Sequence, residues 1–357
     1  MARRSDPPLP SCFALVIPGL EKVAAEEIKD VLAAEIKRTL PGMVVFRSRQ
    51  IDKRLLALRT VEDVFLLAWG SDELTHRFED LKHIQAWTAR QADWTSLLQL
   101  HHQIHAKPKG TPGYRLVSQM EGPHAYRRVD AQKALAQGLA GKLPARWRAV
   151  EENASVEVWI RIIQSTAVCG IRLSDRTMRH RTYKREHIAA SLRPTVAAAM
   201  VRLADVGAGE LLLDPCCGAG TILAEHLEIA RNARTLGGDI DKKALAAARS
   251  NLRRYQSARL ICWDARRLPL AESTCRRIAC NPPFGKRLGK AHEIHDLYQG
   301  LVSECNRVLQ PGGRAVFLVA DPRPIKSAAR QSNWQSMRTL RVRVLGQSAT
   351  VLVFQKP

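Results

Sequence analysis

The chain has 357 residues, which is more than one ordinary domain contains and enough to bury two or three hydrophobic cores. Hydrophobic residues make up 45% of it and charged residues 25%, as in globular proteins, and no apolar run approaches the roughly 20 residues that span a bilayer, which argues against a helical membrane protein. Lysines and arginines number 56 against 34 acids and are not gathered in one tail, so the folded surface should be positive and nucleic acid is the expected partner.

The cysteines and the first residues indicate the compartment. Eight cysteines are scattered along the chain without a Cys-x-x-Cys pair, which argues against a disulfide framework and against zinc. Met1-Ala-Arg-Arg is followed by Asp6-Pro-Pro and not by the apolar core of a signal peptide. We therefore expect a cytoplasmic protein with reduced cysteines and no zinc. We also expect a monomer with no bound metal and no membrane contact.

Residues 1–70 predict a small α+β unit of ferredoxin-like type. Apolar residues recur at helical spacing from residue 20 to residue 40, where Pro41-Gly42 ends the pattern. The other elements expected here are strands at 11–17, 43–46 and 61–69 and a helix at 51–58. This composition indicates no site, and Trp69 is expected in the core.

Residues 71–173 predict a second α+β unit. We expect helices around 84–87, 94–100 and 129–143 and strands at 114–120, 156–163 and 166–173. The stretch Gly113-Tyr-Arg-Leu-Val-Ser118, and the run Gly122-Pro-His-Ala-Tyr-Arg-Arg128 that leads into a helix, resemble the THUMP domain, an RNA-binding module of modification enzymes. Basic residues surround the same strand and loop, where they could follow a phosphate backbone or form a merely solvated basic face. They are Lys107, Lys109, Arg115, Arg127 and Arg128.

Two groups of histidines have nearly the spacing of a metal site. If helical, His101 and His105 lie one turn apart, but no carboxylate or cysteine completes a ligand set. His292-Glu-Ile-His295 is one residue shorter than the zinc-protease pattern, so its two imidazoles would not face one ion. We therefore predict no metal site.

Residues 174–190 are predicted to link the second unit to the last domain, residues 191–357. The basic run Met178-Arg-His-Arg-Thr-Tyr-Lys-Arg185 either follows RNA or is only a charged connector. Under the first interpretation the RNA contacts are Arg179, Arg181, Lys184 and Arg185.

The last domain contains a strand, a glycine turn and a helix in the stretch 210–225. An apolar run ends at Asp214, and a turn with Gly218 and Gly220 precedes helical spacing. At the carboxyl end of a parallel strand, such a turn lets a ligand approach the backbone and the free N–H groups of the helix. A dinucleotide fingerprint requires a third glycine where Leu223 stands, which disfavours NAD. The alternative to any ligand is a turn that only packs a strand on a helix.

Strands and helices alternate through the rest of this domain, as a doubly wound α/β sheet requires. The expected elements are strands at 235–240, 259–262, 277–280 and 314–319, helices at 244–255 and 297–309, and a terminal antiparallel hairpin of strands 339–345 and 348–354. Asp239 ends a strand about twenty residues after the glycines, where an acid can accept both hydroxyls of a ribose. The strand 277–280 ends in Asn281-Pro-Pro-Phe284, whose prolines stop the ladder. Taken alone, that turn could be a buried Pro-Pro turn with a core phenylalanine.

Two motifs now support a family resemblance. Asp-x-x-Cys-Gly-x-Gly, beginning at Asp214, is similar to the first motif of class I S-adenosylmethionine-dependent methyltransferases. Asn281-Pro-Pro-Phe284 resembles the Asn-Pro-Pro-aromatic motif of those that methylate exocyclic amino groups. The resemblance implies S-adenosylmethionine as cofactor, with Thr195 at its methionine end and Asp264 at its adenine amine. The full set that it assigns to the cofactor is Thr195, Asp214, Cys216, Gly218, Gly220, Asp239, Ile240, Asp264, Ala265 and Asn281.

The same resemblance gives the second turn its chemistry. An amino nitrogen conjugated with a base is a poor nucleophile, so acceptors on Asn281 and on the Pro282 backbone would hold its hydrogens and aim its lone pair at the methyl group. Phe284 would stack on the base, which must swing out of its helix to arrive. Many relatives carry tyrosine where this chain has Phe284, so a phenolic hydroxyl is not essential here. Lys286 and Arg287, which follow the turn, are expected to contact RNA.

In order along the chain, the units resemble the THUMP-domain tRNA guanine-N2 methyltransferases. The resemblance implies methylation of the exocyclic amino group of a guanosine in tRNA, giving N2-methylguanosine at position 6 of the acceptor stem. The alternatives are another guanosine of tRNA or one in ribosomal RNA, the adenine N6 of DNA, and an RNA-binding protein without activity. The THUMP-like unit favours RNA over DNA, and the intact motif residues argue against an inactive protein.

Overall fold

The computed structural model describes residues 9–188, 191–230, 232–284, 291–344 and 346–357, without the side chains of 291–293. The chain forms two compact units. The first unit consists of Met1–Leu15, Ala25–Leu58 and Asp63–Met178, and the second of Val16–Ala24, Arg59–Glu62 and Arg179–Pro357. Two short segments from the N-terminal part of the chain therefore belong to the second unit.

An eight-stranded sheet forms the first unit, in the order β2-β3-β1-β4-β8-β7-β5-β6. Its strands are β1 (Ser11–Val16), β2 (Glu35–Leu40), β3 (Met43–Arg47), β4 (Val61–Ser71), β5 (Gly113–Glu121), β6 (Arg148–Ala149), β7 (Val156–Ile163) and β8 (Thr166–Arg172). The strand β5 runs parallel to β6 and β7, whereas β7 and β8, like β4 and β8, are antiparallel.

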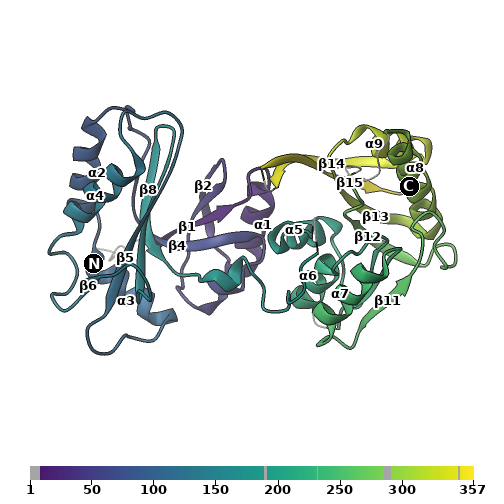
Figure 1. Cartoon of the computed structure of the whole chain (residues 1–357), viewed down its shortest axis with the longest axis horizontal. Helices are drawn as coiled ribbons and strands as arrows, with labels where there is room; N and C mark the ends of the chain where they lie inside the picture. The colour runs from purple at the N-terminus through teal and green to yellow at the C-terminus, as the bar shows by residue number, and fades with distance from the viewer. Residues whose placement is uncertain (1–8, 189–190, 231, 285–290, 345) are drawn as a thin grey trace, which may run out of the picture. The chain divides into compact units, whose positions relative to one another are not determined.

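One hydrophobic core joins strands from both of the N-terminal regions distinguished in the sequence. Phe13 of β1 stacks on Phe65 of β4 with ring centroids 4.5 Å apart, and Phe65 lies 5.4 Å from Trp159 of β7. The helices are α1 (Glu21–Leu32), α2 (Glu79–Arg90), α3 (Trp94–Ile104) and α4 (Arg128–Leu139), with 3-10 turns at Lys53–Ala57 and Arg176–Met178. Figure 1 shows α2 and α4 side by side. The predicted boundary at residue 70 falls inside β4.

The helix predicted over residues 20–40 is wrong in its second half. The helix α1 ends at Leu32, Ala33 adopts a left-handed conformation (φ 50°), and Glu35–Leu40 forms the strand β2. Pro41-Gly42 then joins β2 to β3 as a two-residue turn in which Gly42 has φ 71°. Proline followed by a positive-φ glycine is the pattern of a type II turn. Pairing with β3 therefore overrides the helical spacing of a largely exposed segment.

A seven-stranded sheet forms the second unit, in the order β11-β10-β9-β12-β13-β15-β14. Its strands are β9 (Leu211–Asp214), β10 (Arg234–Asp239), β11 (Ala258–Cys262), β12 (Cys275–Cys280), β13 (Leu309–Val319), β14 (Gln335–Val344) and β15 (Gln347–Gln355). The first five strands of that order are parallel, and β15 is antiparallel to β13 and β14. The doubly wound sheet and the terminal hairpin are thus confirmed.

Four helices of the second unit contribute side chains to two hydrophobic clusters. The first cluster contains side chains of α8 (Ala291–Val308) and α9 (Arg323–Gln331), and the second contains side chains of α6 (Thr221–Ile229) and α7 (Lys242–Leu252). Figure 1 shows α6 and α7 near each other, next to α5 (Pro194–Ala204), and α8 and α9 together elsewhere on the sheet. The strand order reverses between the neighbours β9 and β12, which is where open α/β sheets bind ligands. Among the described residues, no helix is long and apolar enough to cross a bilayer.

Candidate active site

The glycine turn lies at the carboxyl end of β9. Gly218 and Gly220 both have positive φ (52° and 75°), a conformation that strains any residue with a side chain. Gly220 is the N-cap of α6, and a Cβ placed on it would lie 2.9 Å from Leu252 Cδ1 of α7. A Cβ on Gly218 would have Ile188 Cδ1 as its neighbour, at 3.7 Å. The backbone is therefore packed tightly against α7 at Gly220, whereas at Gly218 only the end of the Ile188 side chain comes within 4 Å of the Cβ position among the described residues.

Asp239 joins the end of β10 to the glycine turn. Its Oδ2 accepts a hydrogen bond from Gly218 N at 2.9 Å, and its Oδ1 accepts one from Asp241 N at 3.0 Å. Each carboxylate oxygen can accept a second hydrogen bond. The carboxylate is therefore held in position and retains acceptor capacity for two hydroxyl groups. The exposed Ile240 side chain, 68% accessible, follows it and offers an apolar surface for a base.

Asp214 is buried beneath the same turn. It is 1% exposed, and its Oδ1 accepts a hydrogen bond from Cys216 N at 3.2 Å. Burial raises the pKa of the Asp214 carboxyl well above its usual range, and the nearby Asp239 carboxylate adds to this. The buried Asp214 side chain therefore holds the first residues of the glycine turn in place through its hydrogen bond with Cys216 N.

The Asn281-Pro-Pro-Phe284 turn follows β12, the neighbour of β9. The hydroxyl of Tyr298 in α8 donates to the Pro283 carbonyl at 2.9 Å and anchors the turn. Asn281 Oδ1 is buried and has no hydrogen-bond partner among the residues that the structure describes. A buried unpaired acceptor costs about 1–3 kcal/mol. It is therefore the atom here that a ligand's N–H group would satisfy.

The other predicted cofactor residues occupy varied environments. Thr195 at the start of α5 is buried, and its hydroxyl donates to Glu62 Oε1 at 3.1 Å. Ala265 is buried in the cluster beneath α8 and α9. Asp264 binds the Arg266 guanidinium, with Oδ2 2.7 Å from Nη2, and this hydrogen bonding lowers the pKa of its carboxyl. Asp264 would have to share its oxygens between Arg266 and an adenine amine.

The arrangement fits S-adenosylmethionine. The glycine turn, the Asp239 carboxylate and an Asn281 Oδ1 that has no partner among the described residues lie at the carboxyl ends of three neighbouring strands. These are the features that a nucleoside carrying a transferable group beside an amino substrate requires.

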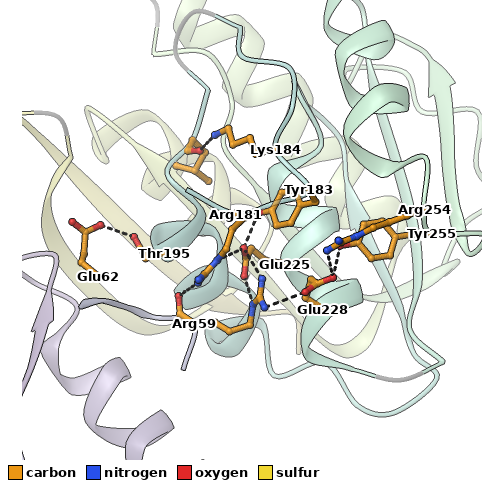
Figure 2. A network of polar contacts seen from close by, with 11 residues as sticks. Arg59, Glu62, Arg181, Tyr183, Lys184, Thr195, Glu225, Glu228, Arg254 and Tyr255 are labelled. Carbon is orange, nitrogen blue, oxygen red and sulfur yellow. Dashed lines mark hydrogen bonds and ion pairs between the residues drawn. The ribbon is translucent and has the colours of Figure 1, made fainter. Parts of the chain in front are cut away.

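The basic run before the last domain is bound to the second unit. Figure 2 shows Arg59, Arg181 and Tyr183 converging on Glu225 of α6, which is fully buried. Arg181 Nε lies 3.1 Å from Glu225 Oε1, and its own exposure is only 8%. The interpretation of Arg181 as an RNA contact is therefore corrected, because its guanidinium forms an ion pair with the buried Glu225 carboxylate.

Its neighbours in the run differ in exposure. Lys184 is partly buried and donates to the Leu192 carbonyl at 2.5 Å; burial lowers the pKa of its ammonium group to about 8. Arg185 is exposed, and Arg179 is partly exposed. Lys286 and Arg287 lie outside the described residues.

The basic residues predicted to contact RNA in the first unit are all exposed: Lys107, Lys109, Arg115, Arg127 and Arg128. The charged partners of Arg115 and Arg127 are Glu157 at 3.8 Å and Asp130 at 3.4 Å. Surface pairs of this kind contribute little stability, so such side chains can exchange a carboxylate for a phosphate at small cost.

The histidine groups show no metal geometry. The His101 and His105 rings stack with centroids 4.6 Å apart, and His105 Nε2 lies 2.7 Å from the Leu173 carbonyl oxygen. Burial lowers the pKa of His101 to about 3. Within the described residues, no group of three or more metal-ligating side chains has an arrangement that could hold a metal ion. The His292 side chain is not described.

Three residues of this region were not identified from the sequence. Glu225 and Asn251 are polar residues on the buried faces of α6 and α7, and Tyr298 anchors the turn after β12. A glutamate among Ile222, Leu223 and Ala224, and an asparagine beside Ala248 and Leu252, interrupt apolar helix faces. A polar residue on an apolar helix face could have identified both positions, since buried polar groups normally have hydrogen-bond partners.

Comparison with known proteins supports one family. The model described as UPF0020, RMKL-like, methyltransferase domain, matches residues 181–349. The tRNA (guanine(6)-N2)-methyltransferase of Thermus thermophilus is 29% identical over 318 residues, covering 87% of this chain and 89% of that protein.

Two solved structures have the same fold over nearly the whole chain. TrmN from Thermus thermophilus superposes with a TM-score of 0.78 at 25% identity, over 97% of this chain and 99% of that one. SMU.472, solved in complex with SAH, gives a TM-score of 0.71 at 15% identity, over 99% of each chain.

Proposed function

Because this chain belongs to the THUMP/UPF0020 class of S-adenosylmethionine-dependent tRNA guanine-N2 methyltransferases, we propose that it methylates N2 of the guanosine at position 6 of tRNA. The chain covers 89% of the Thermus thermophilus enzyme, whose name specifies guanine 6 of tRNA. We also propose that the protein acts as a monomer.

The observation that carries this proposal is the buried Oδ1 of Asn281, which has no hydrogen-bond partner within the described part of the chain. It lies at the end of β12, beside the strand that leads into the glycine turn. An amide oxygen accepts hydrogen bonds, so a ligand group that binds to it must be a hydrogen-bond donor, such as the amino group of a guanine. A carboxylate or phosphate substrate would leave it unpaired.

Asn281 and Phe284 then have distinct roles. Asn281 Oδ1 accepts one amino hydrogen and the Pro282 carbonyl accepts the other, which turns the nitrogen lone pair toward the methyl group. Phe284, which is partly exposed, stacks on the extruded base. Catalysis rests mainly on alignment, since the cofactor supplies a methyl group already activated on a positively charged sulfur.

The cofactor side of the site is assigned to the first turn. The Asp239 carboxylate accepts the ribose hydroxyls, and Gly218 and Gly220 allow the cofactor to approach the backbone. Asp214 holds the turn from below through Cys216 N. Thr195 and Asp264 complete the set at the two ends of the cofactor.

The tRNA is held by contacts away from the reacting base. A guanine amino group in a stem lies in the shallow minor groove, and one extruded base does not identify the RNA that carries it. We assign this task to the exposed Lys107, Lys109, Arg115, Arg127 and Arg128, with Arg179 and Arg185.

The proposal is tested by methyl transfer in vitro. Full-length protein and labelled S-adenosylmethionine are incubated with unmodified tRNA transcripts that carry guanosine or adenosine at position 6, and the product is mapped by nuclease digestion and mass spectrometry. We expect N2-methylguanosine at position 6 of the first transcript and no product at that position of the second.

Parallel reactions with ribosomal RNA and duplex DNA distinguish the alternatives. Methylation confined to another tRNA guanosine would refute position 6. Preferential methylation of ribosomal RNA, or of adenine in DNA, would refute the tRNA assignment.

A further inference from the structure

The side chain of Asn251 in α7 is buried, with 2% exposure, and makes four hydrogen bonds. Its Oδ1 accepts from Arg185 N at 2.8 Å and from Glu186 N at 2.9 Å. Its Nδ2 donates to the Glu186 carbonyl at 3.1 Å and to the Ala219 carbonyl at 3.0 Å. The amide uses both donors and both acceptor sites, which only asparagine provides in this geometry.

These partners come from two separate parts of the chain. Ala219 lies between the two positive-φ glycines of the cofactor turn. Arg185 and Glu186 belong to the run that precedes α5, 66 and 65 residues away from Asn251. Asn251 therefore ties the glycine turn directly to that run.

Further contacts fix the part of the same run that precedes Arg185. Arg181 and Tyr183 donate to Glu225 Oε1 at 3.1 and 2.7 Å, and Lys184 donates to the Leu192 carbonyl (Figure 2). Glu225 also accepts from Arg59 Nε at 2.6 Å. Burying a charge costs free energy unless the charge is paired. The Glu225 carboxylate is paired with two guanidinium groups and accepts a hydrogen bond from a hydroxyl.

The run leads to the glycine turn. Ile188, two residues beyond Glu186, is the side chain nearest to the position that a Cβ on Gly218 would occupy, at 3.7 Å. The residues 181–188 thus extend from a buried anchor at Glu225 to the Gly218 backbone of the cofactor turn. We call them the covering segment.

We propose that the covering segment is part of the cofactor site and that Asn251 is its positioning residue, setting the distance between Ile188 and the glycine turn. The proposal rests on the cofactor assignment above but not on which RNA is modified. Asn251 acts through the backbone of Ala219, Arg185 and Glu186 and does not itself touch the reacting atoms.

Asn251→Asp tests this with almost no change of shape. The aspartate keeps both acceptor sites and loses the two donors, so the carbonyls of Ala219 and Glu186 would each face a carboxylate oxygen. We expect the calorimetric Kd for S-adenosylhomocysteine to rise by about tenfold or more, since two buried carbonyls lose their donors. The KM for S-adenosylmethionine should rise likewise, while kcat at saturating cofactor stays within about threefold, because the segment contacts no reacting group.

Two matched variants separate this effect from charge and from general destabilisation. Gln256→Glu adds the same charge at an exposed site just beyond α7. Ile325→Ala creates a cavity in the cluster beneath α8 and α9 and lowers Tm. Both should keep the wild-type Kd for S-adenosylhomocysteine.

An unchanged Kd in Asn251→Asp would overturn the proposal. So would a Kd rise of equal size in Ile325→Ala, or a loss confined to kcat. Failure of the wild-type protein to bind S-adenosylhomocysteine would instead refute the cofactor assignment itself, so the two failures are distinguishable.

Discussion

The two turns at the switch point of the second unit differ in how their polar groups are satisfied. In the glycine turn, Gly218 N, Asp239 and the Ala219 carbonyl all have protein partners. In the turn after β12, the Asn281 Oδ1 is buried without a partner among the described residues. The first turn is thus held by hydrogen bonds within the protein, while the second contains an acceptor to which a substrate can donate a hydrogen bond.

This difference separates binding from chemistry. A fixed turn loses little entropy when the cofactor binds, which favours affinity. An unpaired acceptor gains most when an amino group reaches it, which favours the reacting geometry over a merely bound one. Variants in the two turns should therefore fail in different ways.

The largest effect is expected from Asn281→Ala. Removing the acceptor should lower kcat by about 10²–10³-fold, the usual result of deleting one aligned polar group. The Kd for S-adenosylhomocysteine should stay near that of the wild type, as measured by calorimetry beside methyl transfer. Asn306→Ala in α8 is the matched control, and near-normal turnover of Asn281→Ala would remove Asn281 from the chemistry.

Asp239→Ala should show the opposite pattern. Loss of the ribose acceptor and of the bond to Gly218 N should weaken cofactor binding by about 1–3 kcal/mol. The neighbouring Asp241 accepts from Lys243 N as the N-cap of α7, so Asp241→Ala should lower Tm and leave cofactor affinity unchanged. Equal cofactor affinities for these two variants would contradict the assignment of Asp239.

Gly220→Ala tests how tightly the first turn is packed. Its left-handed backbone alone costs about 1–2 kcal/mol for alanine, and its Cβ would lie 2.9 Å from Leu252 Cδ1. Gly209 has nearly the same φ, 73°, with nothing within 4 Å of its Cβ position. In denaturant titrations, Gly220→Ala should have a lower free energy of unfolding than Gly209→Ala. Equal values would show that Leu252 of α7 moves aside without loss of stability.

The smallest effect concerns pH and His226 of α6. This ring is buried, and burial lowers its pKa from 6.5 to about 4. Between those values the unfolded chain binds the proton and the folded chain does not, so stability falls as pH falls through this window. The contribution from pH 7 to pH 5 is of order 1 kcal/mol. The stability of His226→Leu should decline less over that range; a parallel decline would show that His226 does not contribute.

The motifs of both turns could be predicted because each is contiguous in the sequence. Asp214 through Gly220 and Asn281 through Phe284 specify their own backbone through glycines and prolines, so their place at strand ends followed directly. The partners of Glu225 could not be predicted in the same way. Arg181 and Arg59 lie 44 and 166 residues away from it, and only the folded chain brings them together.

Secondary structure was mistaken where tertiary pairing decided it. Residues 35–40 have helical spacing but form β2 because β3 pairs with them across Pro41-Gly42. The helix α9 was missed, since a segment that buries only Ile325, Ala328 and Ala329 gives a weak apolar signal. Arg181 was assigned to RNA because its sequence neighbours are basic, although its buried partner lies elsewhere in the chain.

The central claim is that the second turn aligns the exocyclic amino group of a guanine. The most direct test is methyl transfer to two tRNAs that differ only at position 6, one with guanosine and one with inosine, which lacks that amino group. We predict labelled N2-methylguanosine from the first and no label at position 6 of the second, with the two tRNAs binding within about threefold of each other because most contacts are to phosphates. Equal methylation of the inosine-containing tRNA at that position would contradict the account.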